Sequence, residues 1–137
     1  MSSDVGKEYF LEFIAYAIRV TYEKREFLRN NNKEEDWRSH NPLYWVEVKG
    51  PILGLLVECS EEVEINDGDE FQYEYYFKVI YQTSDGHKVQ LKLSYNYWWS
   101  IDIDPIADIA DDPDHDYLYM IDEIEKIKLG SCEILST

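Results

Sequence analysis

Carboxylates are the side chains of this chain with the greatest capacity for chemistry, and they are concentrated in two blocks. Residues 58–74 contain eight acidic residues and residues 102–125 contain ten, and neither block contains a lysine or an arginine. Closely spaced carboxylates can ligate a divalent cation, or they can present a negative surface to a positively charged partner. The two blocks therefore indicate either a metal site or a docking surface.

The second block contains the densest run, in which seven aspartates occur between residues 102 and 116. This run lacks the glycine at the sixth position and the glutamate at the twelfth that an EF-hand loop requires, so we expect neither a metal site nor a cofactor. Docking of a basic partner and a solvated loop that serves only solubility remain as interpretations, and the interleaved isoleucines weigh against the second. The expected docking residues are Asp102, Asp104, Asp108, Asp111, Asp112, Asp114 and Asp116.

The first block is expected to form an outward row of carboxylates on a strand. Glu62 and Glu64 would lie beside Glu70 or Gln72 of a partner strand. Such a row can imitate the phosphates of a nucleic acid, since a duplex carries one charge per roughly 1.7 Å of its axis. An ordinary solvated strand face is the alternative interpretation of this block.

Aromatic residues alternate with other residues on two predicted strands, and the odd-numbered ones are expected to face the core. Trp98 and Tyr76 should then point to the opposite side, and Trp and Tyr often anchor protein interfaces. Trp98 is therefore an expected apolar contact for a partner, and Trp37, Tyr44 and Trp45 raise the same question. A ligand or cation site on the aromatic face is the alternative.

Catalysis has little support in the sequence. The histidines at positions 40, 87 and 115 lie on predicted connectors and turns. Cys59 and Cys132 lie in predicted strands, without the helix start or glycine-rich turn that lowers a thiol pKa. No serine occupies a nucleophile elbow and no glycine-rich loop precedes a helix, so we expect no enzyme activity.

A helix must come first along the chain. Apolar residues between Phe10 and Thr21 recur at helical spacing, which predicts a helix from Gly6 to about Arg29. A polar connector follows, with a short helical turn expected over residues 34–38. The next predicted elements are a strand over Leu43–Lys49, a turn at Gly50-Pro51 and a strand over Ile52–Cys59.

The central predicted element is a hairpin. Every odd position is apolar or aromatic from Phe71 to Tyr81 and from Val89 to Trp99. A two-residue loop would put the two apolar rows on opposite faces, so we expect a three-residue loop with a left-handed Gly86, which pairs Thr83 with His87. The same register places Lys78 directly opposite Lys92, which is mildly unfavourable.

The remaining segments complete a sheet. We expect a short strand at Val63–Ile65, an irregular acidic excursion over residues 101–116, a strand at Tyr117–Ile121 and a last strand over Lys126–Leu135 that is interrupted at Gly130. At 137 residues the chain fits one domain. The predicted architecture is α+β, with the N-terminal helix packed on a curved, mainly antiparallel sheet of five to seven strands.

The charge of −16 is unevenly distributed, because residues 1–57 carry a net charge of −1 and residues 58–137 one of −15. Such a surface repels nucleic acid and anionic membranes, so neither is an expected partner. The two cysteines are expected to be buried free thiols in a reducing compartment, although pairing is not excluded. With no signal peptide or spanning segment apparent, the expected location is the cytoplasm.

In size, acidity and aromatic content the chain resembles small cytoplasmic inhibitor proteins, which include phage anti-restriction and anti-CRISPR proteins and the immunity proteins of nuclease toxins. The resemblance is one of composition, includes no motif and transfers no residue. It implies a protein that binds the basic surface of a nuclease or other nucleic-acid-binding protein and blocks it, with mimicry of nucleic acid as one means. The alternatives are a small-molecule or divalent-metal-binding domain and an accessory subunit without catalysis.

Overall fold

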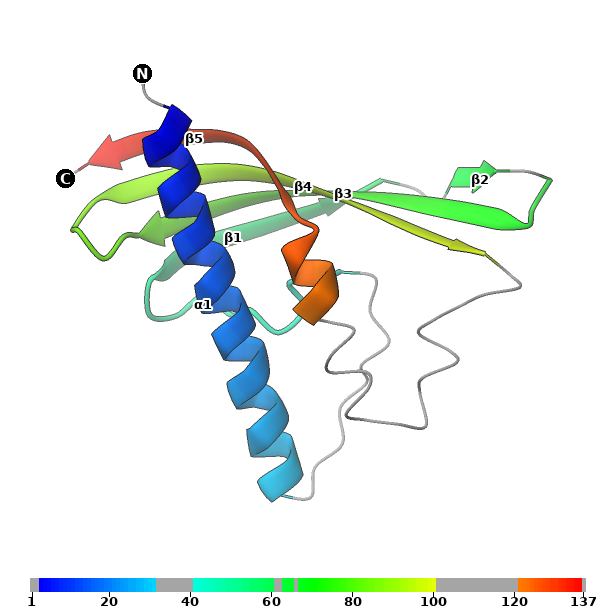
Figure 1. Cartoon of the computed structure of the whole chain (residues 1–137), viewed down its shortest axis with the longest axis horizontal. Coiled ribbons are helices and arrows are strands. Elements are labelled where there is room, and N and C mark those ends of the chain that lie inside the picture. The colour runs from blue at the N-terminus through cyan, green and yellow to red at the C-terminus, as the bar shows by residue number, and fades with distance from the viewer. Residues whose placement is uncertain (1–2, 32–40, 61–62, 66, 101–120, 137) are drawn as a thin grey trace.

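A single long helix lies against a five-stranded antiparallel sheet (Figure 1). The computed structural model describes residues 3–31, 41–60, 63–65, 67–100 and 121–136. Its elements are α1 (Ser3–Asn30), β1 (Ile52–Cys59), β2 (Val63–Ile65), β3 (Glu70–Gln82), β4 (Lys88–Ser100) and β5 (Lys128–Ser136). The strand order is β1-β3-β4-β5, and β2 pairs with the start of β3. The predicted α+β fold is confirmed.

Helix α1 forms because its apolar residues recur on one face, and that face packs on the sheet. Phe13 and Ala17 are completely buried, and Ile14 is nearly so. The ring of Phe13 meets that of Tyr81 edge-on, with centroids 5.9 Å apart. The helix ends where Asn31 turns back on it, since both the backbone N–H and the side-chain amide of Asn31 donate to the Phe27 carbonyl. The predicted apolar face of the helix is therefore correct.

The β3–β4 hairpin has the predicted register. Tyr81 pairs with Val89, Phe77 with Leu93, and the lysines at positions 78 and 92 face each other. Thr83 N–H donates to His87 O at 2.8 Å and Gly86 N–H donates to Thr83 O at 3.1 Å, which closes the three-residue loop. Gly86 has a φ of 93°, in the region that favours glycine.

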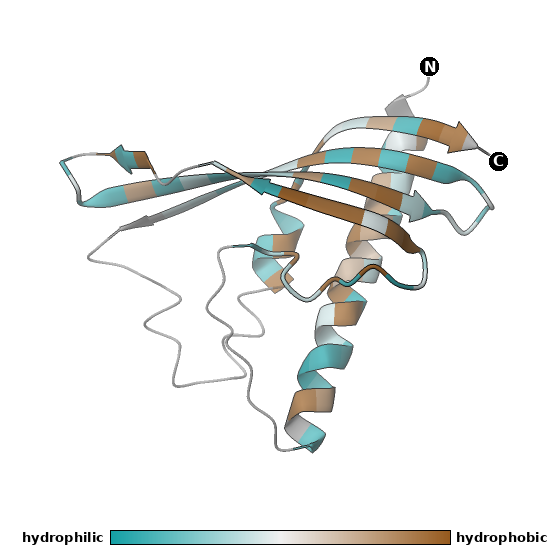
Figure 2. Cartoon of the chain, turned by 180° about the vertical axis from the view of Figure 1, so that it is seen from behind, coloured by the Kyte–Doolittle hydropathy of each residue, from teal (hydrophilic) through white to brown (hydrophobic). Residues whose placement is uncertain are grey.

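The two faces of the sheet differ in what covers them. Odd-numbered residues of β3 and β4 from Tyr75 to Tyr97 are buried beneath α1 and form most of the core. Helix α1 crosses in front of the strands in Figure 1, and the strands lie in front of α1 in Figure 2, which is seen from behind. No other described element covers the opposite side, which we call the exposed face.

The predicted strand over Leu43–Lys49 is wrong, because residues 42–45 form successive turns. The side chain of Asn41 accepts a hydrogen bond from Leu43 N–H at 2.9 Å, and Val46 N–H donates to Leu43 O at 3.0 Å. An asparagine followed by a proline favours this local bonding over a sheet ladder. The side chains of Leu43, Trp45 and Val46 are nevertheless buried.

The C-terminal segment agrees with the prediction only in part. Strand β5 is present, with a register irregularity beside Gly130, where an added Cβ would lie 3.0 Å from the Lys92 carbonyl oxygen. Residues 121–125 form a helical turn, so Ile121 does not end a strand. The rest of the strand predicted from Tyr117, the turn predicted over residues 34–38 and the excursion over residues 101–116 lie outside the described residues.

Both cysteines are free, as the sequence suggested. Cys59 is on β1 and Cys132 is on β5, and strands β3 and β4 lie between them. Three strand spacings of about 4.8 Å exceed the Cα separation of about 7 Å that a disulfide tolerates. The expectation that both thiols are buried is wrong for Cys59, which is exposed at the edge of the sheet.

Candidate interaction face

The exposed face carries large apolar side chains among polar ones. Trp98 and Tyr76 are each 51% exposed, and Leu56 is 50% exposed. The first two occupy even positions of the hairpin, so the pleat that buries their odd-numbered neighbours turns them outward. The prediction that Trp98 and Tyr76 point away from the core is confirmed. Tyr44 is also exposed, whereas Trp45 is buried.

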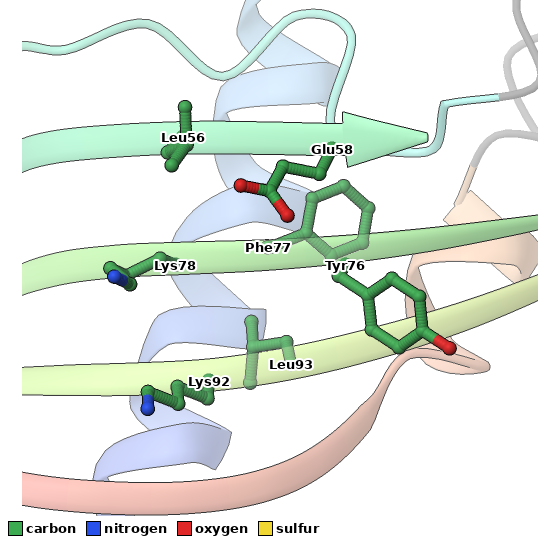
Figure 3. Close-up of a pocket in the computed structure, with 7 residues that line it drawn as sticks. All are labelled: Leu56, Glu58, Tyr76, Phe77, Lys78, Lys92 and Leu93. Atoms are coloured by element: carbon green, nitrogen blue, oxygen red, sulfur yellow. The ribbon is translucent and has the colours of Figure 1, made fainter. Parts of the chain in front are cut away.

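A shallow groove of about 220 Å³ crosses this face (Figure 3). Leu56 and Glu58 of β1 lie along one side of it, with the two facing lysines, Lys78 and Lys92, at one end and Tyr76 at the other. A second hollow of about 470 Å³ begins at Tyr76 and reaches Lys128. Both hollows are open, so they can receive side chains of another surface.

The exposed face is divided by charge along the strands. Residues 58–137 contain only five basic residues, and four of them belong to this face: Lys78, Lys88, Lys92 and Lys128. Lys78, Lys88 and Lys92 lie to one side of the Tyr76–Ser94 level, and we call them the lysine end, whereas Lys128 lies at that level. None of the four lysines forms an ion pair within the described residues.

The opposite end of the sheet is purely acidic. Residues 58–77 and 93–100 contain no lysine or arginine. The described carboxylates there, which we call the acidic end, are Glu58, Glu64, Asp67, Asp69, Glu70 and Glu74. The Tyr76 hydroxyl donates to Glu74 at 3.2 Å, and this hydrogen bond raises the pKa of Tyr76. On the exposed face, Lys78, Lys88 and Lys92 thus lie to one side of the Tyr76–Ser94 level, and Glu70 and Glu74 lie to the other. Glu58 and Lys128 lie at that level, and Glu133 lies among the lysines.

The expected carboxylate row does not form as predicted. Glu64 pairs with Phe71, whereas Glu70 pairs with Ile65, and residues directly opposite each other share a face. Glu64 and Glu70 therefore lie on opposite sides of the sheet. Glu64 remains exposed at the acidic end. Glu62 and the seven predicted docking aspartates lie outside the described residues.

A polar cluster that sequence reasoning missed joins α1 to the hairpin tip. The Tyr9 hydroxyl donates to Asp85 at 2.7 Å, and His87 Nδ1 lies 2.8 Å from the other carboxylate oxygen, which also accepts from Thr83. Hydrogen bonds from Thr83, His87 and Tyr9 hold the pKa of Asp85 well below its usual value. The hydrogen bond to Asp85 in turn raises the pKa of Tyr9 to about 12.

This cluster attaches the helix to the hairpin tip. The Thr83 hydroxyl lies against Asp85 and the His87 carbonyl oxygen, whereas the Tyr9 hydroxyl of α1 lies 3.2 Å from His87 Nδ1. On the same tip, Glu12 of α1 accepts hydrogen bonds from the backbone N–H and the hydroxyl of Ser84. The signal that could have revealed these contacts is the polar Thr-Ser-Asp-Gly-His loop, but nothing in the sequence identifies its helical partners.

Within the described ranges, no three His, Cys, Asp or Glu side chains are grouped so that they could hold a metal ion. None of the helices in that part of the chain has the length and apolar character needed to cross a bilayer. Comparison of the chain with family models, with curated proteins and with solved structures gives no match.

Proposed function

We propose that this chain is a small, non-catalytic inhibitor that docks on a basic protein surface and occludes it. The partner class is a nuclease or another nucleic-acid-binding protein, since such surfaces are rich in lysine and arginine. The proposal places the protein in the cytoplasm with its target, as anti-restriction, anti-CRISPR and immunity proteins are.

The observation that carries the proposal is the position of Trp98. Its side chain is half exposed on a face that α1 leaves uncovered, and the strand segments at the adjoining end of the sheet, residues 58–77 and 93–100, contain acidic residues but no lysine or arginine. A desolvated tryptophan supplies affinity at the centre of many interfaces. Surrounding carboxylates accelerate association with a basic partner and align it. The acidic run over residues 102–116 extends the same charge along the sequence.

The test is capture of partners from a cell lysate on the immobilised protein, with a low-salt wash, a salt step and mass spectrometry of the eluate. Three forms are compared: the wild type, W98A, and a variant with four aspartates of the run changed to asparagine (D102N/D104N/D111N/D112N). We expect the wild type to retain one basic nucleic-acid-binding protein, and both variants to retain less of it. The purified partner should lose its activity on nucleic acid when the wild type is added.

The matched control is E23Q/E26Q, which removes two carboxylates from α1, away from the exposed face. This variant should capture the partner as the wild type does. If W98A and the aspartate variant retained the partner as well as the wild type does, neither Trp98 nor the acidic run would have a role in docking. A captured partner that stays fully active when saturated would refute inhibition while leaving binding intact.

A further inference from the structure

The lysines of the exposed face have no role in docking to a basic target, and they require a separate explanation. In a chain of net charge −16, Lys78, Lys88 and Lys92 stand on one half of a sheet face, and none of them pairs with a described carboxylate. Lys78 and Lys92 even face each other across the hairpin. Such a pair is mildly unfavourable unless an anion covers it. The surface that fits it must combine carboxylates with apolar groups.

We propose that the exposed face binds the same face of a second copy of this chain. Two sheets pack face to face with their strands nearly aligned and about 10 Å apart. A twofold axis that lies between the sheets, across the strands at the level of Tyr76, brings the lysine end of each copy onto the acidic end of the other. The interface is then self-complementary, as twofold symmetry requires.

The register of the hairpin makes this complementarity specific. Positions 78 and 92 lie two residues to one side of the Tyr76–Ser94 level, and positions 74 and 96 lie two residues to the other side. The symmetry therefore places Lys78 of one copy over Glu74 of the second copy, and Lys92 over Asn96, which is paired with Glu74. Six residues from the axis, the Gln82–Lys88 level of one copy meets the Glu70–Ser100 level of the other.

The apolar residues follow the same symmetry. Trp98 pairs with Gln72, four residues from the axis, and the level four residues to the other side holds Ile80 and Gln90. Trp98 of each copy thus lies over Gln90 of the other, beside the partly buried Ile80 on the neighbouring strand. Tyr76 lies near the axis and meets its own counterpart, between the two hollows of the face. The arrangement covers both exposed aromatic residues and the Lys78–Lys92 pair in one contact.

Self-association does not depend on the inhibitory role, since it needs no third protein. The two uses of the face exclude each other, because both bury Trp98. A target that docks on the acidic end would then convert dimers to monomers.

The test is sedimentation velocity at about 0.15 M salt, where charges more than about 8 Å apart are largely screened. The wild type is measured from about 1 μM to about 1 mM, the range over which modest interfaces dissociate. Two variants reverse one side of the contact each: E74K sets lysine against Lys78 and Lys92, and K78E/K92E sets glutamate against Glu74. We expect a wild-type dimer, and a dissociation constant at least about tenfold higher for each variant.

An equimolar mixture of E74K and K78E/K92E distinguishes this contact from a general effect of charge. In the mixed dimer both pairs are again opposite in sign, so the mixture should recover the dimer that each variant alone has lost. The control is E8K on α1, which makes the same change of charge on the other side of the molecule and should leave the dimer intact. Circular dichroism verifies that each variant is folded.

Three results would overturn the proposal. The first is a wild type that stays monomeric up to about 1 mM. The second is a dimer that E74K and K78E/K92E do not weaken, since association would then use another surface. The third is a mixture of the two variants that remains monomeric although each is folded.

Discussion

The protonation of Asp85 depends on contacts that only the folded structure makes. Its carboxylate accepts hydrogen bonds from Thr83, His87 and Tyr9, and these bonds depress its pKa. A depressed pKa stabilises the fold fully above the unfolded-state value, about 3.9 for aspartate, and this stabilisation is lost as the pH falls below it. The cluster therefore makes the attachment of α1 to the hairpin tip sensitive to acid.

We predict that D85N lowers the melting temperature at pH 7 and that the difference from the wild type shrinks at pH 3, where Asp85 of the unfolded chain is mostly protonated. Thermal unfolding followed by circular dichroism at both pH values measures this difference. Y9F keeps the ring of Tyr9 and removes one donor to Asp85, so it should show a smaller change of the same sign. A D85N variant whose deficit is the same at both pH values would show that the carboxylate charge makes no contribution.

At the scale of the elements, the hairpin was predictable because two constraints act together. The alternation of apolar residues fixes the face of each strand, and only a three-residue loop keeps both apolar rows on one side. Helix α1 was predictable from the spacing of its apolar face. The exposure of Trp98 followed from the same alternation. The outward orientation of this part of the candidate site could therefore be predicted from the sequence pattern alone.

The errors arose where hydrogen bonding competes with the apolar pattern. Residues 43–46 are mostly buried, so their composition resembles a strand, yet Asn41 directs the backbone into turns. Strand β2 is too short for its pattern to define a face, and its pairing with β3 puts Glu64 opposite Phe71. The contact of Tyr9 with Asp85 joins residues far apart in sequence, and no local pattern indicates such a contact.

The packing of α1 on the sheet provides a prediction about stability. Phe13 is fully buried against Tyr81, whereas Leu11 on the other side of the helix is 52% exposed. We expect F13A to lower the free energy of unfolding by about 3–5 kcal/mol, because it leaves a cavity between helix and sheet. Urea denaturation measures the loss.

L11A is the matched control, since it makes a similar truncation on the same helix and should change stability by less than about 0.5 kcal/mol. Equal losses in F13A and L11A would mean that the face of α1 that packs on the sheet differs from the one described here.

For the whole molecule, the structure adds a separation of charge that the sequence alone does not reveal. The two acidic blocks are visible as runs of residues, but the lysines are scattered between positions 78 and 128. Only the register of β3, β4 and β5 brings Lys78, Lys88 and Lys92 to one end of one face, with Lys128 near its middle. Residues 58–77 and 93–100, toward the other end, contain no lysine or arginine. Carboxylates therefore repel one another at one end, and the lysines at the other end form no ion pair within the described residues.

This separation predicts how salt affects folding. Charges interact over a Debye length of about 30 Å at 0.01 M salt but only about 8 Å at 0.15 M, so added salt should raise the melting temperature by weakening repulsion between carboxylates. D67N/D69N removes two charges from the acidic end, and asparagine tolerates the φ of 57° at position 67. We expect this variant to melt higher than the wild type at low salt, and the two melting temperatures to converge as salt is added.

The control is E23Q/E26Q, which removes two carboxylates from a segment of α1 that is rich in arginine and lysine. Glu23 lies 3.9 Å from Arg19 there, so its loss relieves no repulsion and should not raise the melting temperature. If both variants gained equally at low salt, the total charge would govern stability and its position would not matter. A gain confined to D67N/D69N would locate the repulsion at the acidic end, where a basic partner or the lysine end of a second copy would relieve it.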